Sequence, residues 1–284
     1  MSVGLSTAFV QSFDALVKQA YQGMGMLRPT VRVKTGVTGS SHRFTNIGKG
    51  IATPRIPQTD VVPMNIAYTN ATATLEDWNA PEYTDIFDQP KVNFDERQQL
   101  AMVIAGAITR REDQLILDAL TAGTPVGTVS ENEGGANTNL NTAKCRKAKQ
   151  LLDQQGVPVR DRHMVVHANN IFGLLGDTTA TSSDFATIKA LVNGEINTWL
   201  GFNIHMMEDR DEGGLAITAS VRTGFAYHGG GMGSTGHAVG LEFRTEINYI
   251  AEKTSWLANG LFSAGSVVID GNGFADVDMN ETGV

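Results

Sequence analysis

One stretch of the sequence, residues 93–123 (NFDERQQLAMVIAGAITRREDQLILDALTAG), predicts a single long helix around which the rest of the chain is organised. Asn93 is a suitable N-cap residue, and Glu96 stands three residues later, as in a capping box. Apolar side chains then recur on one helical face, at Leu100, Ile104, Ala107, Ile108, Leu115 and Leu120. Gly123, followed by Pro125, ends the helix. At about 1.5 Å per residue the helix is roughly 45 Å long, which is the width of a small domain.

The segment before this helix, residues 31–91, carries few large apolar side chains. Five of the eight prolines of the chain lie in it: Pro54, Pro57, Pro63, Pro81 and Pro90. Val31 and Val33 alternate with basic residues as in a β-strand, and the stretch from Ile66 to Leu75 is also extended. Such a ribbon buries too little apolar surface to offset the entropy of ordering it. We therefore expect contacts from outside the chain to hold it in place.

The segments at the start and in the middle of the chain are of mixed character. Residues 1–30 predict an arm with one short amphipathic helix, too short to form a domain. A polar connector from Ser130 to Asn141 leads into residues 142–228, which alternate between helix and strand. The elements expected there are helices at Ala143–Gln155 and Asn169–Leu175, a helix from Ser183 or Asp184 to Val192, and strands at Met164–Ala168 and Phe202–Met206.

The end of the chain is extended throughout. Leu241, Phe243, Ile247 and Tyr249 alternate with polar residues for about ten positions, which predicts a long strand with one apolar face. Residues 265–270 (GSVVID) predict a short closing strand. Together with the helices, these strands indicate an α+β fold.

Composition restricts the class of protein. The 284 residues, 41% of them hydrophobic and 18% charged, are typical of a soluble globular chain with ample material for a core. No apolar run approaches the roughly 20 residues that cross a bilayer, and the N-terminus lacks the features of a signal peptide. The single cysteine, Cys145, excludes an internal disulfide and fits a reducing cytoplasm. The net charge of −8 argues against tight nucleic-acid binding, although it allows a container whose lining tolerates nucleic acid.

A glycine-rich motif, Gly231–Gly236 (GMGSTG), satisfies the GxGxxG pattern. A dinucleotide site needs this turn between a strand and a helix, because the helix N-terminus meets the pyrophosphate. The residues from Ala238 onward alternate as a strand instead. The motif therefore predicts a flexible hairpin and not a nucleotide site.

Histidines occur in two pairs. His163 and His167 share one face of the expected strand, but at roughly 3.3 Å per residue they lie about 13 Å apart, whereas zinc reaches only about 2 Å to each nitrogen. His228 and His237 flank the glycine motif without a clear carboxylate companion. We expect structural roles for all four histidines.

Two further features resemble sites but have simpler explanations. Cys145 lies among Lys144, Arg146 and Lys147, which would lower the pKa of its thiol, but no family signature for a nucleophile surrounds it. The acidic clusters at 208–212 and 276–281 are suited to a divalent ion, although a solvated charged turn is the commoner arrangement. The sequence thus predicts no catalytic site, no cofactor and no metal.

The order of the segments resembles that of the major capsid proteins of tailed bacteriophages, which share the Hong Kong 97 fold. The residues that carry the resemblance are 94–98 (FDERQ), 110–118 (RREDQLILD), 156–158 (GVP), 162–167 (RHMVVH), 191–194 (LVNG), 199–204 (WLGFNI), 223–228 (TGFAYH), 238–241 (AVGL) and 264–270 (AGSVVID). No single motif is diagnostic, but their order and spacing cover nearly the whole chain.

The resemblance implies a domain organisation. Residues 1–30 would be the N-terminal arm, 31–91 an extended β-hairpin loop on a neighbouring subunit, and 92–141 the spine helix with the first part of the peripheral domain. Residues 142–228 would form the axial domain, and 229–284 the return strands of the peripheral domain and the C-terminus.

The resemblance also implies a function and partners. The chain would be a structural protein, not an enzyme, that self-assembles into hexamers and pentamers of an icosahedral virion shell around double-stranded DNA. Because it has no room for a helical scaffolding region before the arm, a separate scaffolding protein is expected, along with portal and cement proteins. Assembly would take place in the host cytoplasm, without a membrane. Some relatives carry a lysine–asparagine cross-link, but nothing in this sequence identifies such a pair.

Two alternatives stay open at this stage. The nearer is an encapsulin-type nanocompartment, which uses the same fold to house an enzyme. The more distant is a nucleotide-dependent α/β enzyme built on residues 142–236. Co-purified cargo separates the first from a capsid, and nucleotide-dependent thermal shifts test the second.

Overall fold

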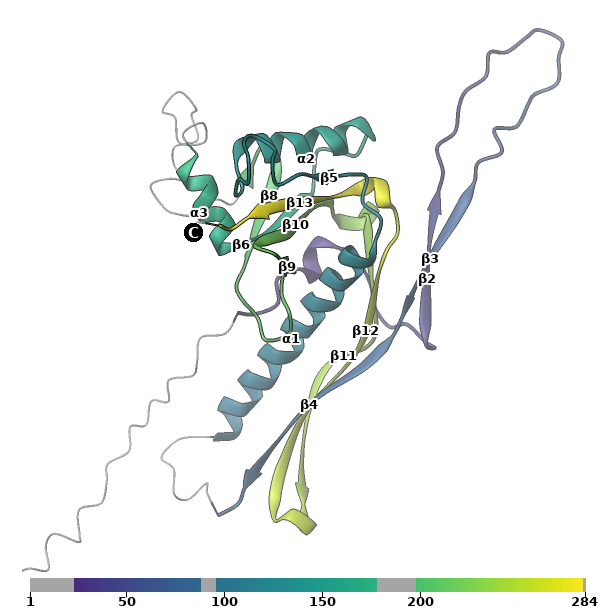
Figure 1. The fold of residues 1–284 in the computed structure, drawn as a ribbon. Coiled ribbons are helices and arrows are strands. Elements are labelled where there is room, and N and C mark those ends of the chain that lie inside the picture. Colours follow the sequence, from purple (N-terminus) through teal and green to yellow (C-terminus); the bar gives the residue numbers. More distant parts are fainter. Residues whose placement is uncertain (1–22, 88–95, 178–197, 283–284) are drawn as a thin grey trace, which may run out of the picture.

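The structure, a computed structural model, describes residues 23–87, 96–177 and 198–282. Two β-sheets and a separate hairpin are arranged around one long helix (Figure 1). The three α-helices of the described residues are α1 (Glu96–Ala122), α2 (Thr142–Gln154) and α3 (Ala168–Gly176). The mixture of helix and strand confirms the expected α+β class.

Helix α1 is the long helix predicted from residues 93–123. Its proposed cap, Asn93, lies outside the described residues. Ile104 and Ile108 are buried as expected, but nearer the C-terminal end Ile116 and Leu117 are the most buried and Leu115 is only half-buried. This end of α1 packs between two apolar clusters, so its buried surface is wider than the single face that the sequence predicted. The polar run Glu112–Gln114 is buried too.

A four-stranded sheet lies along one side of α1. Its strand order is β1 (Arg32–Lys34), β11 (Thr235–Ile250), β12 (Ser255–Val268) and β4 (Glu76–Asp85). Strand β1 runs parallel to β11, and the other pairs are antiparallel. Apolar residues of this sheet pack on α1 around Ile108: Trp78, Ala80, Val239, Phe243, Phe262 and Ala264.

A seven-stranded sheet packs against the C-terminal end of α1. Its order is β5 (Thr128–Val129), β13 (Phe274–Asn280), β10 (Val221–His228), β6 (Arg162–His167), β8 (Phe202–Met207) and β7 (Thr198–Trp199), with β9 (Ile217–Thr218) paired to β10. One apolar cluster joins this sheet to α2 and α3 through residues such as Ala148, Leu152 and Ile171. A second cluster joins Phe225 and Tyr227 of β10 to Leu117 and Leu120 of α1. The helix therefore connects the two sheets.

The remaining strands, β2 (Ser41–Ile47) and β3 (Tyr68–Thr74), pair only with each other. They form a hairpin that projects from the body of the molecule (Figure 1). At its root, Phe44 and Ala73 are buried against Ala238 of β11. The expectation that contacts from outside the chain hold residues 31–91 in place is thus wrong at both ends, because β1 and β4 pair within the four-stranded sheet of the same chain. The hairpin root is also anchored internally, since Phe44 is buried.

Several predicted elements are confirmed, namely the helices α2 and α3 and the strands β1, β3, β6 and β8. The predicted arm helix within residues 1–30 and the helix ending at Val192 lie mostly or wholly outside the described residues. Phe202, Ile204 and Met206 alternate with polar residues in the sequence, so all three would lie on the buried face of β8, but Met206 is exposed.

The end of the chain differs from its prediction in two ways. Strand β11 extends over 16 residues, and register shifts between Val239 and Arg244 interrupt the expected alternation. Residues 265–268 are the end of β12, not a short separate strand, and the chain closes with β13. Strand β13 pairs with β10, so residues 274–280 belong to the sheet that the sequence analysis confined to residues 142–228.

Candidate functional site: exposed apolar surfaces and buried polar anchors

The hairpin exposes an unusual amount of apolar surface. Between its two strands, residues 48–67 form no helix or strand, and nearly all of them are exposed. Val61 is 93% exposed. The other large apolar residues exposed on the hairpin and its loop are Ile47, Ile51, Ile56, Val62, Met64 and Tyr68. Large apolar side chains exposed together on one hairpin of a folded chain indicate an interaction site.

A second exposed apolar surface lies at the far end of the four-stranded sheet. Tyr83 lies in β4 and Phe87 lies just beyond its end. Ile247 and Tyr249 lie in β11, near its turn into β12. Lys253 in that turn donates to the Tyr83 hydroxyl at 2.9 Å. The turn between β11 and β12 and the neighbouring end of β4 lie at the opposite end of the sheet from the root of the β2–β3 hairpin (Figure 1).

The first described residues, Gly23–Val31, form a strap that crosses α1. Asp113 of α1 accepts hydrogen bonds from the backbone N–H groups of Met26 and Leu27, the latter at 2.8 Å. Arg210 donates to the same carboxylate at 2.8 Å, and both side chains are only 1% exposed. Burial raises the pKa of the Asp113 carboxyl, although the bonds from Arg210 and the strap act in the opposite direction.

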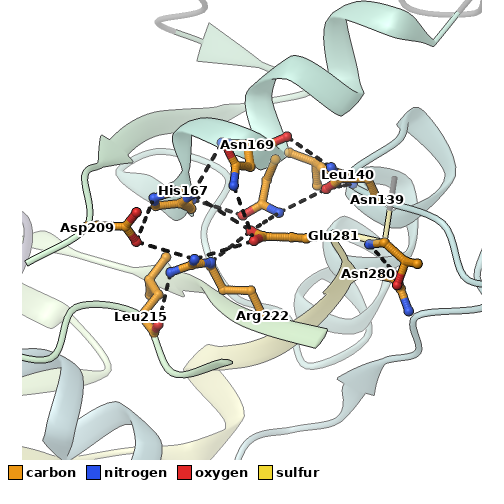
Figure 2. A network of polar contacts seen from close by, with 11 residues as sticks. Asn139, Leu140, His167, Asn169, Asp209, Leu215, Arg222, Asn280 and Glu281 are labelled. Carbon is orange, nitrogen blue, oxygen red and sulfur yellow. Dashed lines mark hydrogen bonds and ion pairs between the residues drawn. The ribbon is translucent and has the colours of Figure 1, made fainter. Parts of the chain in front are cut away.

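A polar network ties the end of the chain to the seven-stranded sheet (Figure 2). The Glu281 carboxylate accepts from Arg222 Nε of β10 at 2.8 Å, and the amides of Asn169 and Asn170 on α3 donate to it. Arg222 also donates to the Leu215 carbonyl. This carboxylate is therefore paired and hydrogen-bonded, which a buried charge requires.

His167 lies at the edge of the same network (Figure 2). Its Nδ1 accepts from the Asn169 backbone N–H and caps α3, with Asn170 completing the capping box. Its Nε2 lies 3.2 Å from Asp209, to which Arg222 also donates. The capping-box spacing of His167 and Asn170 was a signal in the sequence that the prediction did not use. The pairing of Arg222 with Glu281 had none, because 59 residues separate them.

The other histidines are also used within the described fold. His163 and His167 lie on strand β6, as expected. His163 Nδ1 lies 3.0 Å from His205 Nε2, and the His237 side chain is buried beside Glu112. Among the described residues, no group of three or more histidine, cysteine, aspartate or glutamate side chains is arranged to hold a metal ion.

The glycine motif leads into a strand, as expected, but the predicted hairpin is wrong. Gly230–Met232 form a 3-10 turn and β11 begins at Thr235, within the motif, while the preceding strand β10 belongs to the other sheet. The helix N-terminus that a pyrophosphate requires is not at this position.

The environment of Cys145 reverses one expectation. The thiol is 1% exposed on the inner face of α2, and burial raises its pKa to about 12. The neighbouring Lys144 is also buried and donates to the carbonyls of Thr138 and Asp278. Burial lowers the pKa of Lys144 to about 8. Lys144 does act to lower the thiol pKa, the direction that the sequence suggested, but the loss of solvation is the larger effect and the pKa rises.

The acidic clusters are bound to arginines. In residues 208–212, Arg210 bonds Glu208 as well as Asp113, and Glu212 accepts from Arg110 at 2.9 Å. The solvated turn expected there is correct for Asp209 and Asp211, which are exposed, but Arg210 and Glu212 pair with residues of α1. In residues 276–281 the last carboxylate belongs to the network of Figure 2, and burial raises the pKa of Asp276 to about 6.

None of the described helices is both long and apolar enough to cross a membrane. Taken together, the described residues provide exposed apolar surfaces and buried carboxylates that are paired with arginines. The candidate sites weighed above show no nucleophile with a positioned base.

Comparisons with known proteins agree with this picture. The profile of the family described as "Phage capsid protein" matches residues 5–281. Among solved structures, the capsid of cyanophage P-SCSP1u is similar with a TM-score of 0.75 and 17% identity, over 98% of this chain and 94% of that chain. The acid-stable capsid of Helicobacter pylori bacteriophage KHP30 has a TM-score of 0.76 at 10% identity, over 98% and 97%.

A Mycobacterium phage Che8 structure is similar with a TM-score of 0.71 and 16% identity, over 98% of both chains. No curated protein matches. The family match spans nearly the whole chain, and the structural matches share its fold from end to end. The chain belongs to the phage capsid protein family and is a structural, non-enzymatic major capsid protein of the phage head with the Hong Kong 97 fold.

Proposed function

We propose that this subunit forms hexamers and pentamers that close into an icosahedral shell around the double-stranded DNA of a tailed phage. The observation that carries the proposal is the hairpin of β2 and β3 with its loop 48–67, whose apolar side chains contact little of their own chain. Burying them against a neighbouring subunit would release about 25 cal/mol for each Å² of apolar surface removed from water. Such surfaces are typical of obligate interfaces.

The proposed domains follow the sheets. The peripheral domain consists of α1 and the four-stranded sheet, which includes β4, while the axial domain consists of the seven-stranded sheet, including β13, with α2 and α3. Residues 1–30 act as an arm and the hairpin as the extended loop, both in contact with neighbouring subunits. The exposed Tyr83, Phe87, Ile247 and Tyr249 provide a further contact between subunits.

The proposed partners are those that membership of the phage capsid protein family implies. A separate scaffolding protein guides assembly, a portal occupies one vertex, and cement proteins bind the finished surface. The DNA is held by loose, non-specific contact, since the subunit carries a net charge of −8. Assembly takes place in the host cytoplasm, where the single cysteine stays reduced.

The experiment that tests the proposal shortens the hairpin. Replacing residues 36–78 would also remove Phe44, Ala73 and Trp78, which pack in the core. The replacement is therefore limited to residues 48–67, for which a short Gly/Ser linker is substituted. The subunit is expected to stay soluble and to melt cooperatively by circular dichroism, while electron microscopy with scaffolding protein supplied shows no closed particles.

A matched variant separates length from chemistry. It keeps the loop length but replaces Ile51, Ile56, Val61, Val62 and Met64 with serine, and it is expected to lose particles as the shortened hairpin does. Normal shells from the shortened hairpin would refute the proposed role of the loop. The cargo of the wild-type particles, DNA or an enzyme, separates a phage head from a nanocompartment.

A further inference from the structure

The strap packs against α1 through its backbone as well as its side chains. A Cβ atom added at Gly25 would lie 2.6 Å from the backbone oxygen of Thr109, so only glycine allows this approach. Two residues later, Leu27 is fully buried and packs with Ile116 and Leu117 of the helix. The strap is thus seated on α1 over a defined length.

The polar contacts of the strap converge on one carboxylate. Both oxygens of Asp113 accept the Met26 N–H, Oδ1 also accepts the Leu27 N–H, and Oδ2 accepts Arg210. Asp113 is the side chain of α1 that binds consecutive N–H groups of the described strap. Bonds to an ionised acceptor in a buried setting are stronger than ordinary ones.

The point where the chain enters the strap is fixed by two arginines. Arg210 donates to the Met24 carbonyl at 3.4 Å, and Arg110 donates to the Gly23 carbonyl at 3.5 Å. Each arginine is held in turn by a carboxylate of residues 208–212. The start of the strap is therefore coupled to α1 and to the loop that follows β8.

We infer that Asp113 is the positioning residue that sets where the N-terminal arm leaves the subunit, and so directs the arm toward its neighbour. This inference rests on the proposed role of residues 1–30 in contacts between subunits. Loss of the Asp113 charge would leave the fold in place, since Leu27 stays buried and Arg210 keeps Glu208. The hydrogen-bonded seating of residues 23–26 on α1 would be weakened.

The test uses Asp113→Asn, which removes the charge with little change of shape. Amide hydrogen exchange at Met26, whose N–H donates to Asp113, is expected to become several-fold faster than in the wild type, because an amide oxygen accepts this bond more weakly than a carboxylate. The melting midpoint falls, because the buried Arg210 loses a charged partner, but the subunit still folds, and the yield of closed particles falls. Gly25→Ala weakens the same contact by pushing the strap away from the Thr109 carbonyl. This variant replaces Asp113→Asn if the latter does not fold.

Two controls make the outcome decisive. Asp118→Asn removes an exposed carboxylate on the same helix and is expected to leave both the exchange at Met26 and the yield unchanged. A deletion of residues 1–22 sets the yield that remains without the arm. Unchanged hydrogen exchange at Met26, an unchanged yield, or a yield below that of the deletion would each overturn the assignment of Asp113. A normal yield from the deletion would instead refute the proposed role of the arm and remove the basis of the inference.

Discussion

His237 of β11 and Glu112 of α1 form a buried contact, with His237 Nε2 lying 3.0 Å from Glu112 Oε1. The imidazole is fully buried, and its Nδ1 lies 2.8 Å from the Ser266 hydroxyl on β12. Because a carboxylate only accepts, Nε2 carries the hydrogen of this bond. Arg28 of the strap lies 3.3 Å from the same carboxylate and balances its charge. One carboxylate thus joins the strap, the long helix and two strands.

Glu112→Ala is expected to lower the free energy of unfolding by about 1 to 3 kcal/mol, because it leaves the buried His237 N–H without its acceptor. Glu112→Gln keeps an acceptor oxygen and is expected to cost less. Urea unfolding measures both effects. Glu246→Ala, which removes an exposed pair with Arg244, is the control and is expected to cost less than about 1 kcal/mol. Equal losses for Glu112→Ala and Glu246→Ala would contradict the assigned role.

Ile116→Ala is expected to destabilise the subunit by roughly 2 to 5 kcal/mol, since the side chain is fully buried in the cluster between α1 and the seven-stranded sheet. Leu115→Ala at the half-buried neighbouring position is expected to cost less. Leu115→Asp is still expected to prevent folding, because the charge would face the cluster around Ile108 without a partner. The free energy from denaturant unfolding ranks the variants, and a larger loss at Leu115→Ala than at Ile116→Ala would contradict the observed orientation of the helix.

Stability is expected to fall in acid through His163. Burial, assisted by the nearby His205, lowers the pKa of His163 to about 4 from an ordinary value of 6.5. Asp161 favours the proton and His228 opposes it. Because the unfolded chain binds this proton more readily, the free energy of unfolding decreases as the pH falls from 6.5 to about 4.

His163→Gln is expected to reduce that decrease, which urea unfolding at several pH values measures. His42→Gln in the hairpin is the comparison variant. If both changes reduced the pH dependence equally, His163 would not be its source.

Cys145 is expected to stay unreactive in the native subunit. Its thiol is buried and carries a pKa of about 12, so almost no thiolate forms near neutral pH. Ellman's reagent is expected to titrate one thiol after denaturation and none before. Alanine at Cys145, or at His163 or His167, is expected to change stability at most and to leave assembled particles intact. Fast reaction of the native thiol would contradict its burial.

The sequence predicted the elements that local patterns specify. Apolar periodicity and the stop at Gly123 located the long helix, and alternation identified the strand that contains Leu241. The strand after the glycine motif was sufficient to argue against a nucleotide site. Proline content and weak apolar patterning identified residues 31–91 as an extended segment, but they did not locate loop 48–67 within it.

Partners distant in the chain could not be found in the same way. Leu115 and Ile116 are adjacent, and which of them is buried depends on how α1 rotates between two sheets that form from separate segments. Similarly, β4 was assigned to the extended loop because its polar sequence gives no sign that β12 pairs with it along its whole length.

The sequence by itself thus determined the long helix, the α+β class and the extended segment before the helix, since each follows from the chemistry of neighbouring residues. Only the tertiary structure decided the rest. It brought Asp113 to the strap, Glu112 to His237 and Arg222 to Glu281, and it buried Cys145 among apolar neighbours. The physical reason is that burial and pairing of charges depend on distances between segments, and local sequence patterns carry no information about those distances.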